Sequence, residues 1–201
     1  VQNKIGEALI KGMQAKGVTW HLGHLATEVD RIGEQYQVTL SSGKKIKVDG
    51  VFSAIGLRPY LDLAQSADLK TNHGIVVNRW LQTSERHIFA LGDCAEVDGH
   101  VKMYVSPLLQ CAKALAKVLT GGEDPVHYPC MPVVIKTPAC PVVSSPPPRG
   151  LEGSWSYEGE GSDLRALFHD EEGQLRGFAL VGDKVRDKMT LAKQLPLVFE
   201  E

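Results

Sequence analysis

The chain has 201 residues, and 43% of them are apolar, which is enough to bury a core in one large or two small domains. Its formal net charge of −2 gives no reason to expect nucleic acid or an anionic membrane as a partner. No apolar run approaches the roughly 20 residues that span a bilayer, and the first residues lack the layout of a signal peptide. We therefore expect a cytoplasmic protein.

Neither the cysteines nor the histidines form a pattern of metal ligands. None of the four cysteines belongs to a Cys-x-x-Cys pair, so we expect free structural thiols at Cys94, Cys111, Cys130 and Cys140. His21 and His24 stand three residues apart in a strand-like run, which places their side chains on opposite faces. The sequence therefore predicts no metal site.

The first quarter of the chain predicts one helix followed by short strands. Residues 3–16 place Ile5, Leu9 and Met13 on one helical face, and Gly17 is a natural stop. Apolar and alternating runs then predict strands at 18–22, 25–32, 36–40, 46–48 and 51–55. A helix, a strand and a few short antiparallel strands in this order resemble the last part of a nucleotide-binding domain.

The middle of the chain contains the segment around which we expect the other elements to be organised. Residues 88–91 have the apolar content of a buried strand and lead directly into Gly92 and Asp93. At the carboxyl end of a strand in an open α/β sheet, a carboxylate can accept hydrogen bonds from the sugar-like hydroxyls of a ligand. The alternative is an ordinary turn in which Asp93 caps a helix.

The best-defined helix of the sequence begins near residue 106. We expect Ser106 as its N-cap, Pro107 at its first helical position and Gly121 just after its end. A short helix at 61–67 and a strand at 74–78 are expected upstream.

From Asp124 onward the sequence is rich in proline and predicts a small α+β domain. One short strand is expected at 133–137. Three antiparallel strands are then expected, at 154–158, 164–169 and 175–181, with a tight turn at 170–173. A final helix is expected at 184–195.

Two motifs resemble those of two-dinucleotide-domain flavoprotein reductases, the glutathione-reductase-like superfamily. Residues 83–93 read Thr-x-x-x-x-Ile-Phe-Ala-x-Gly-Asp and resemble the second FAD-binding motif of that family. Residues 54–59 resemble its A-x-G-x-R-P crossing between the NAD and FAD domains. The two motifs occur in the family's order, and this is more specific than either motif alone.

This resemblance implies cofactors and residues that bind them. The cofactors are FAD and NAD(H), and Asp93, preceded by Gly92, is expected to hydrogen-bond the ribityl chain of FAD. The backbone of Val105 and Ser106, at the start of a helix, is expected to face the flavin edge that is negatively charged when reduced. Further cofactor-binding positions are expected at the domain crossing, at Ile55 and Gly56.

The last third of the chain indicates which members of this superfamily the chain resembles most. Residues 134–138, Val-Ile-Lys-Thr-Pro, with the β-meander and terminal helix, resemble rubredoxin reductases and nitric-oxide-reductase flavorubredoxin reductases. The resemblance implies hydride transfer from NAD(H) to FAD and single-electron transfer to rubredoxin, with Lys136 close to the flavin as a catalytic and cofactor-binding residue. The alternative for Lys136 is an ordinary surface lysine. Disulfide reductases of the superfamily carry a His-Pro-Thr sequence near the C-terminus as the base that serves a dithiol. No His of this chain is followed by Pro-Thr, so the resemblance disfavours disulfide reduction.

A rubredoxin-like acceptor is expected to be acidic and to dock weakly, so exposed cations near the flavin should matter for association. Candidates lie on the predicted terminal helix, at Lys184, Arg186, Lys188 and Lys193. The alternative is a solvated helix face without a partner.

The sequence contains no G-x-G-x-x-G motif, at which dinucleotide domains hold a pyrophosphate. We therefore expect the C-terminal half of a longer reductase with an α/β plus α+β fold, which would bind FAD weakly without the missing N-terminal half. Its parts would be 1–51 from the NAD(H)-binding domain, 52–123 from the FAD-binding domain and a small domain at 124–201. The alternatives are an NADH oxidase, a nitrite reductase subunit, a ferredoxin reductase, or a scaffold without flavin.

Overall fold

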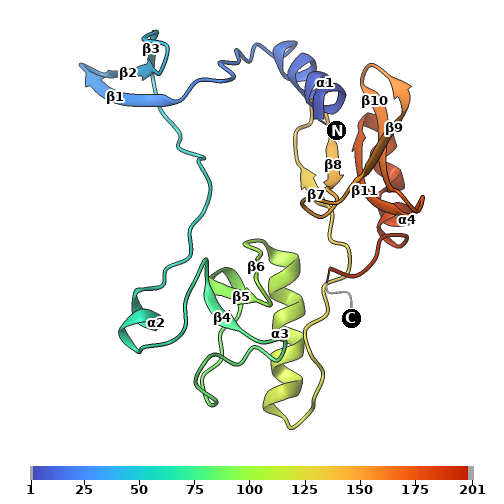
Figure 1. Cartoon of the computed structure of the whole chain (residues 1–201). Helices are drawn as coiled ribbons and strands as arrows, with labels where there is room; N and C mark the ends of the chain where they lie inside the picture. Colours follow the sequence, from blue (N-terminus) through green and yellow to red (C-terminus); the bar gives the residue numbers. More distant parts are fainter. Residues whose placement is uncertain (1, 199–201) are drawn as a thin grey trace. The chain divides into compact units, whose positions relative to one another are not determined.

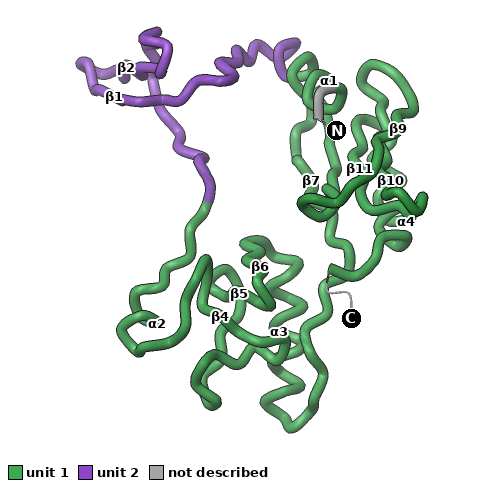
Figure 2. The backbone as a smooth tube through the Cα atoms, in the orientation of Figure 1, with its two compact units in different colours: residues 1–12, 57–201 green, residues 13–56 purple. Residues whose placement is uncertain are grey.

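The computed structural model of the chain describes residues 2–198 (Figure 1). The chain divides into two compact units, which are described separately (Figure 2). The smaller unit comprises residues 13–56, and the larger one comprises residues 1–12 together with 57–201.

The smaller unit is built around a three-stranded antiparallel sheet. Its strands are β1 (Ala26–Ile32), β2 (Gln35–Leu40) and β3 (Lys45–Val48), and β2 lies in the middle. The central strand ends at Leu40, which is buried, whereas every residue of the edge strand β1 is exposed. The three strands confirm those predicted at 25–32, 36–40 and 46–48.

Two other strands predicted in this unit are wrong. Residues 18–22 and 51–55 form no strand, and the side chain of Ile55 is 96% exposed. A strand is stable when neighbouring strands satisfy its backbone N–H and C=O groups. Neither run has a pairing partner among residues 2–198, so apolar content alone does not make either of them a strand.

The larger unit contains a small sheet covered by a long helix. Strands β4 (Ile75–Val77) and β5 (Ala95–Val97) are parallel, and β6 (His100–Val101) pairs antiparallel with β5. Helix α2 (Asp62–Ser66) precedes these strands and α3 (Val105–Leu119) follows them. The shared core is apolar and includes Val77, Leu81, Val97, Cys111 and Val126.

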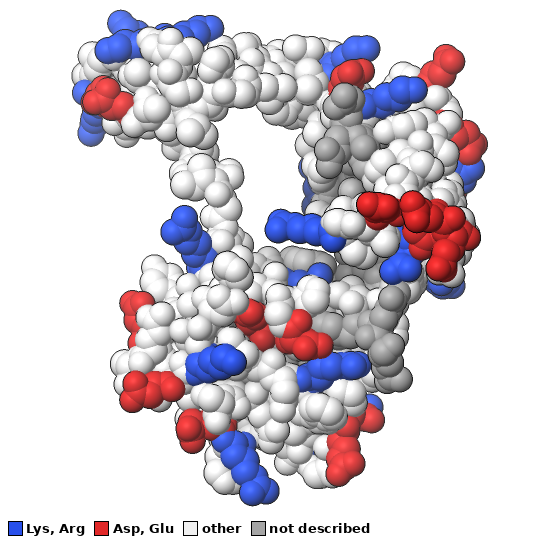
Figure 3. Space-filling model, viewed as in Figure 1, with Lys and Arg blue, Asp and Glu red and all other residues white. Residues whose placement is uncertain are grey.

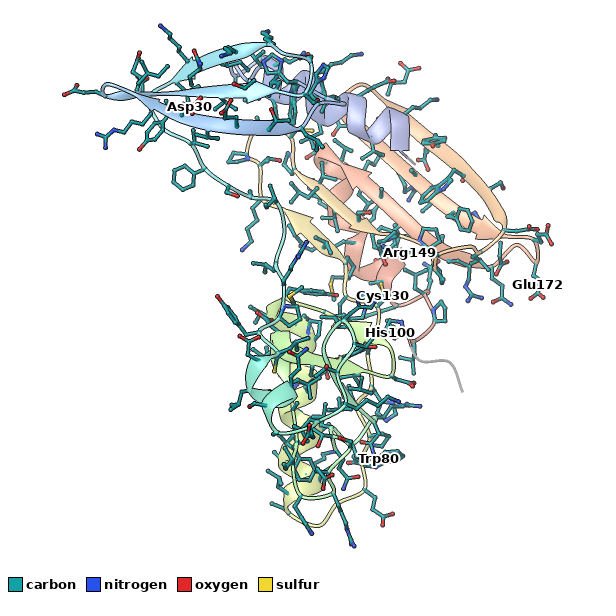
Figure 4. All side chains as sticks on the ribbon, turned by 60° about the vertical axis from the view of Figure 1, so that its left-hand side comes forward. Asp30, Trp80, His100, Cys130, Arg149 and Glu172 are labelled. Atoms are coloured by element: carbon teal, nitrogen blue, oxygen red, sulfur yellow. The ribbon has the colours of Figure 1, made fainter. Side chains whose placement is uncertain are left out.

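A loop after β4 holds the segment that leaves α3. Trp80, labelled in Figure 4, donates from Nε1 to the carbonyl of Glu123 at 2.9 Å. The N–H of Val126, which is fully buried, donates to the carbonyl of Arg79 at 2.6 Å. The proline-rich segment is therefore fixed to this sheet where it begins.

The last third of the chain forms a five-stranded antiparallel sheet in the order β7-β8-β11-β10-β9. Its strands are β7 (Val133–Ile135), β8 (Val142–Ser145), β9 (Gly153–Glu160), β10 (Asp163–Asp170) and β11 (Leu175–Val181). All but β8 confirm predicted strands. The predicted turn at 170–173 is also confirmed, because the Asp170 carboxylate accepts hydrogen bonds from the N–H groups of Glu172 and Gln174.

The sequence does not predict β8, because prolines stand on both sides of it. Pairing with β7 and with β11 nevertheless makes it the second strand of the sheet. Its residues Val142 and Val143 are buried on opposite faces.

The sheet is buried on both faces at its strands β8 and β11, under α1 (Gln2–Gln14) on one face and under α4 (Lys188–Ala192) on the other, whereas its edge strands β7 and β9 are largely exposed. Successive side chains of a strand point to opposite faces. Ala179 and Val181 of β11 therefore belong to the cluster that contains Ile5 and Ala8 of α1. The residues between them, Phe178 and Leu180, belong to the cluster that contains Leu191 of α4.

The predicted helix at 184–195 is partly wrong. Residues Gly182–Asp187 form a 3-10 helix, η2, and only Lys188–Ala192 are α-helical. The N–H of Gly182 donates to the carbonyl of Pro141, and the N–H of Asp183 donates to the Asp163 carboxylate at 2.7 Å. These contacts hold the segment to the sheet before α4 starts.

The packing of α1 predicts opposite effects for its two interior glycines. A methyl group at Gly12 would lie 2.8 Å from Cys140 Cβ, whereas Gly6 has no atom within 4 Å of that position. Gly6→Ala is expected to raise the free energy of unfolding by about 1 kcal/mol through helix propensity. Gly12→Ala is expected to lower it by about 1 kcal/mol, because overpacking outweighs the same gain. Urea unfolding of the two variants measures the difference, and equal effects would contradict the packing of α1 on the sheet.

Candidate functional site

The residues before Asp93 form a compact loop and not the predicted strand. Ile88 is 43% exposed, and Phe89 makes only an isolated bridge with Gln82. The N–H of Thr83 donates to the carbonyl of Ile88, and the N–H of Ala90 donates to the carbonyl of Leu81. These local hydrogen bonds satisfy the backbone, so the prediction of a buried strand at 88–91 is wrong. Asp93 precedes β5 instead of following a strand.

Asp93 lies in a single 3-10 turn, η1 (Gly92–Cys94), directly before β5. Gly92 has a φ of +81°, and a Cβ at this position would lie 3.1 Å from Leu108 Cδ1 in the first turns of α3. Glycine therefore permits both the turn and the close packing of η1 on α3. The Asp93 side chain is exposed, and within residues 2–198 its carboxylate has no hydrogen bond or ion pair.

Helix α3 begins earlier than the sequence predicts. Its N-cap is Tyr104, in an extended conformation and without a side-chain capping hydrogen bond. Ser106 and Pro107 lie inside the first turn, so their predicted positions as N-cap and first helical residue are wrong. The first N–H groups of a helix need partners outside it, and here no side-chain cap supplies one. The predicted end is confirmed, since Gly121 follows the helix with a φ of +88°.

Burial shifts the pKa values of three side chains near the start of α3. Lys102 is half-buried, and burial lowers the pKa of its ammonium group. Burial, and next the charge of Cys130, raise the pKa of the Tyr104 phenol. Burial likewise raises the pKa of the Cys130 thiol, labelled in Figure 4.

Glu96 is a structural residue of the site that the sequence reasoning misses. It is the middle residue of β5 and is only 4% exposed. Its carboxylate accepts hydrogen bonds from Asn72 Nδ2 at 3.1 Å and from the N–H of Gly74 at 3.0 Å. These bonds join β5 to the segment before β4 only three residues after Asp93. The sequence signal that could have identified Glu96 is its position as a charged residue inside the short apolar run 95–97.

The other predicted site residues lie elsewhere. Lys136 follows the edge strand β7, is exposed, and makes no hydrogen bond or ion pair within the described part of the chain. Ile55 and Gly56 belong to the smaller unit, in an exposed segment where Gly56 has a φ of +105°. The structure thus brings Gly92 and Asp93 to the first turns of α3.

Residues 2–198 contain neither a cluster of metal ligands nor a helix that could span a membrane. The structure places no group of three or more His, Cys, Asp or Glu where a metal ion could be held. None of the helices in this range has the length and apolar character needed to cross a membrane. All four cysteines are unpaired, and Cys111 and Cys140 are buried, as expected for structural thiols.

Two family descriptions match adjacent parts of the chain. Residues 1–116 match the family described as "Pyridine nucleotide-disulphide oxidoreductase". The chain belongs to this family. Residues 125–195 match the description "Rubredoxin binding C-terminal domain".

Curated relatives extend this match over most of the chain. A "Rubredoxin-NAD(+) reductase" from Alcanivorax borkumensis is 50% identical over 194 residues, which cover 96% of this chain and 51% of the relative. A protein of the same name from Acinetobacter baylyi is 40% identical, with coverage of 96% and 50%. A "Nitric oxide reductase FlRd-NAD(+) reductase" from Aliivibrio fischeri is 37% identical, with coverage of 97% and 51%. The chain therefore spans about half the length of these relatives.

Solved structures share the fold. A ferredoxin reductase from Rhodopseudomonas palustris superposes with a TM-score of 0.83 at 25% identity, over 97% of this chain and 50% of that one. An NAD-dependent persulfide reductase from A. fulgidus gives a TM-score of 0.86 at 17% identity, over 97% and 41% of the two chains. The predicted α/β plus α+β class is confirmed.

The hydrogen bonds of Glu96 predict that it stabilises the β4–β5 part of the site. Glu96→Ala leaves the buried N–H of Gly74 and the part-buried Nδ2 of Asn72 without their acceptor, and it is expected to lower the free energy of unfolding by about 3 kcal/mol. Glu96→Gln keeps the shape and one acceptor oxygen, so about half of that loss is expected. Urea unfolding with Glu85→Ala, an exposed glutamate, as the control checks the prediction. Equal losses for the alanine and glutamine variants would contradict it.

Proposed function

We propose that this chain forms part of a flavoprotein that transfers electrons from NAD(P)H through FAD to a rubredoxin-type acceptor. The observation that carries the proposal is the match of residues 125–195 to a rubredoxin-binding domain. It stands beside 50% identity to a rubredoxin-NAD(+) reductase over 194 residues. The proposal divides the chain into NAD(H)-domain residues 1–51, FAD-domain residues 52–123 and a small domain at 124–201, in a cytoplasmic enzyme.

The geometry around η1 fits the ribityl and flavin portions of FAD. Asp93 offers an exposed carboxylate without an internal partner, and a carboxylate can accept hydrogen bonds from ribityl hydroxyls. Gly92 allows this turn to pack on α3. The uncapped N–H groups near Val105 and Ser106 favour negative charge on a ligand. When bound, FAD would accept a hydride from NAD(P)H and release electrons singly to the acceptor.

Three more residues belong to the proposal. Lys136 is exposed and unpaired among the described residues, so its ammonium group is available to a reduced flavin or to the nicotinamide cofactor. Ile55 and Gly56 are proposed as cofactor contacts where the chain crosses between its nucleotide-binding parts. The high exposure of Ile55 agrees with a residue whose contacts are made outside this chain's own core.

The candidate cations for docking of the acceptor are Lys184, Arg186, Lys188 and Lys193, of which Lys184 is the weakest candidate because it pairs with Glu158. A ferredoxin is the second candidate acceptor, because the Rhodopseudomonas palustris structure with the same fold is a ferredoxin reductase at 25% identity. The domain match favours rubredoxin.

A chimera tests the proposed function in a complete enzyme. This chain replaces the matching 194-residue segment of the Alcanivorax borkumensis reductase. We expect a yellow protein that oxidises NADH and reduces rubredoxin faster than ferredoxin. Ferricyanide serves as an acceptor that needs no docking. A chimera that reduces ferricyanide but not rubredoxin would overturn the proposed acceptor.

The same chimera tests Asp93. Loss of hydrogen bonds to a charged acceptor costs about 1.5–3 kcal/mol, so Asp93→Ala is expected to weaken FAD binding roughly ten- to hundredfold. Asp93→Asn keeps one acceptor oxygen and is expected to lose less. Asp30→Ala, which removes an exposed carboxylate on β1 (Figure 4), is the matched control and should leave FAD binding unchanged. The measurement is the recovery of flavin fluorescence during dialysis. Retention equal to the parent chimera would refute a role for Asp93.

A further inference from the structure

The segment from η2 to α4 presents one defined face to its surroundings, because its other face is anchored in the sheet. Leu191 is buried in a cluster with Val143, Phe178 and Leu180. Val185 and Leu195 pack partly against the same cluster. Since the apolar face is fixed inward, the residues on the opposite side of this segment point outward.

Ion pairs also join the same segment to the sheet. Lys184 Nζ lies 3.6 Å from Glu158 Oε1 on β9. Arg165 of β10 pairs with Glu158 and, at 3.2 Å, with Asp187. Arg165 lowers the pKa of the Glu158 carboxyl, so this group is charged at neutral pH. Lys184 and Asp187 are therefore engaged inside the domain and are poor candidates for contacts to a partner.

The outward side carries a stripe of three residues, Arg186, Met189 and Lys193. They are spaced three and four positions apart, and the N–H of Lys193 donates to the carbonyl of Met189. Met189 is 60% exposed, and the side chain of Arg186 is 79% exposed. Within residues 2–198 Arg186 pairs only with Asp183, which is about equally exposed, and such surface pairs exchange easily for others.

The charge around the stripe differs from that of the whole chain. Residues 182–195 carry four cations and two carboxylates, whereas the whole chain has a net charge of −2. Lys188, half-buried, and Lys193 have no ion pair within residues 2–198. Three carboxylates of this domain stand instead in the turn between β10 and β11, at Asp170, Glu171 and Glu172. Figure 3 shows a group of acidic side chains toward the right of the view.

We propose that the stripe of Arg186, Met189 and Lys193 docks the acidic one-electron acceptor. This assignment rests on the proposed function. Carboxylates of the acceptor would meet Arg186 and Lys193, and an apolar side chain would cover Met189. Exposed cations around a flexible methionine suit a small, transient interface in which charge sets the association rate. Of the four candidate docking cations, Lys184 is assigned to the fold, Arg186 and Lys193 are assigned to the partner, and the half-buried Lys188 is not part of the stripe.

Steady-state kinetics of the holo-chimera test this docking surface. The variant Arg186→Glu/Lys193→Glu is expected to raise KM for rubredoxin roughly tenfold at low salt, with little change in kcat. Met189→Ser is expected to raise KM by a few-fold at every salt concentration. Both variants should reduce ferricyanide at the parent rate. Lys44→Glu/Lys45→Glu, on the exposed turn and edge strand of the smaller unit, makes the same charge change and should leave KM unaltered.

Salt dependence separates docking from a general charge effect. In the parent chimera KM for rubredoxin should rise with ionic strength, and in Arg186→Glu/Lys193→Glu this rise should disappear. A KM within about twofold of the parent in that variant would overturn the docking surface while leaving the proposed function intact. A parent chimera that reduces ferricyanide but no rubredoxin would overturn both.

Discussion

Burial of both faces of β11 is the constraint on which the last third of the chain depends. Because its side chains alternate, Ala179 and Val181 pack toward α1 while Phe178 and Leu180 pack toward α4. The first helix of the chain thus completes the core of a sheet made from residues 133–181. Removing either layer would expose one apolar face of the sheet to water.

The candidate cofactor site uses a different means of support. The turn η1 lies between two fixed elements, with α3 packed against Gly92 and with Glu96 hydrogen-bonded to the segment before β4. Rigid surroundings allow the Asp93 carboxylate to remain exposed and unpaired among the described residues without loss of position. A polar ligand can satisfy both kinds of group at this site, the Asp93 carboxylate as an acceptor and the uncapped N–H groups of α3 as donors.

Ion pairing decides which surface charges are available for recognition. Lys184 and Arg165 share Glu158, and this network holds η2 to the sheet. Arg186 and Lys193 lie outside it, beside an exposed methionine. The segment of η2 and α4 thus combines an apolar side that is packed on the sheet with charged side chains that are exposed.

The sequence by itself determined α1, the β9–β11 meander with its Asp170 turn, the end of α3 at Gly121 and the family motifs. These features depend on local periodicity, turn chemistry and residue identity. Tertiary structure decided the rest: β8 forms between prolines because β7 and β11 pair with it, whereas 51–55 and 88–91 are not strands because no strand pairs with them among residues 2–198. It also buried Glu96 and engaged Lys184, since both outcomes depend on groups distant in sequence.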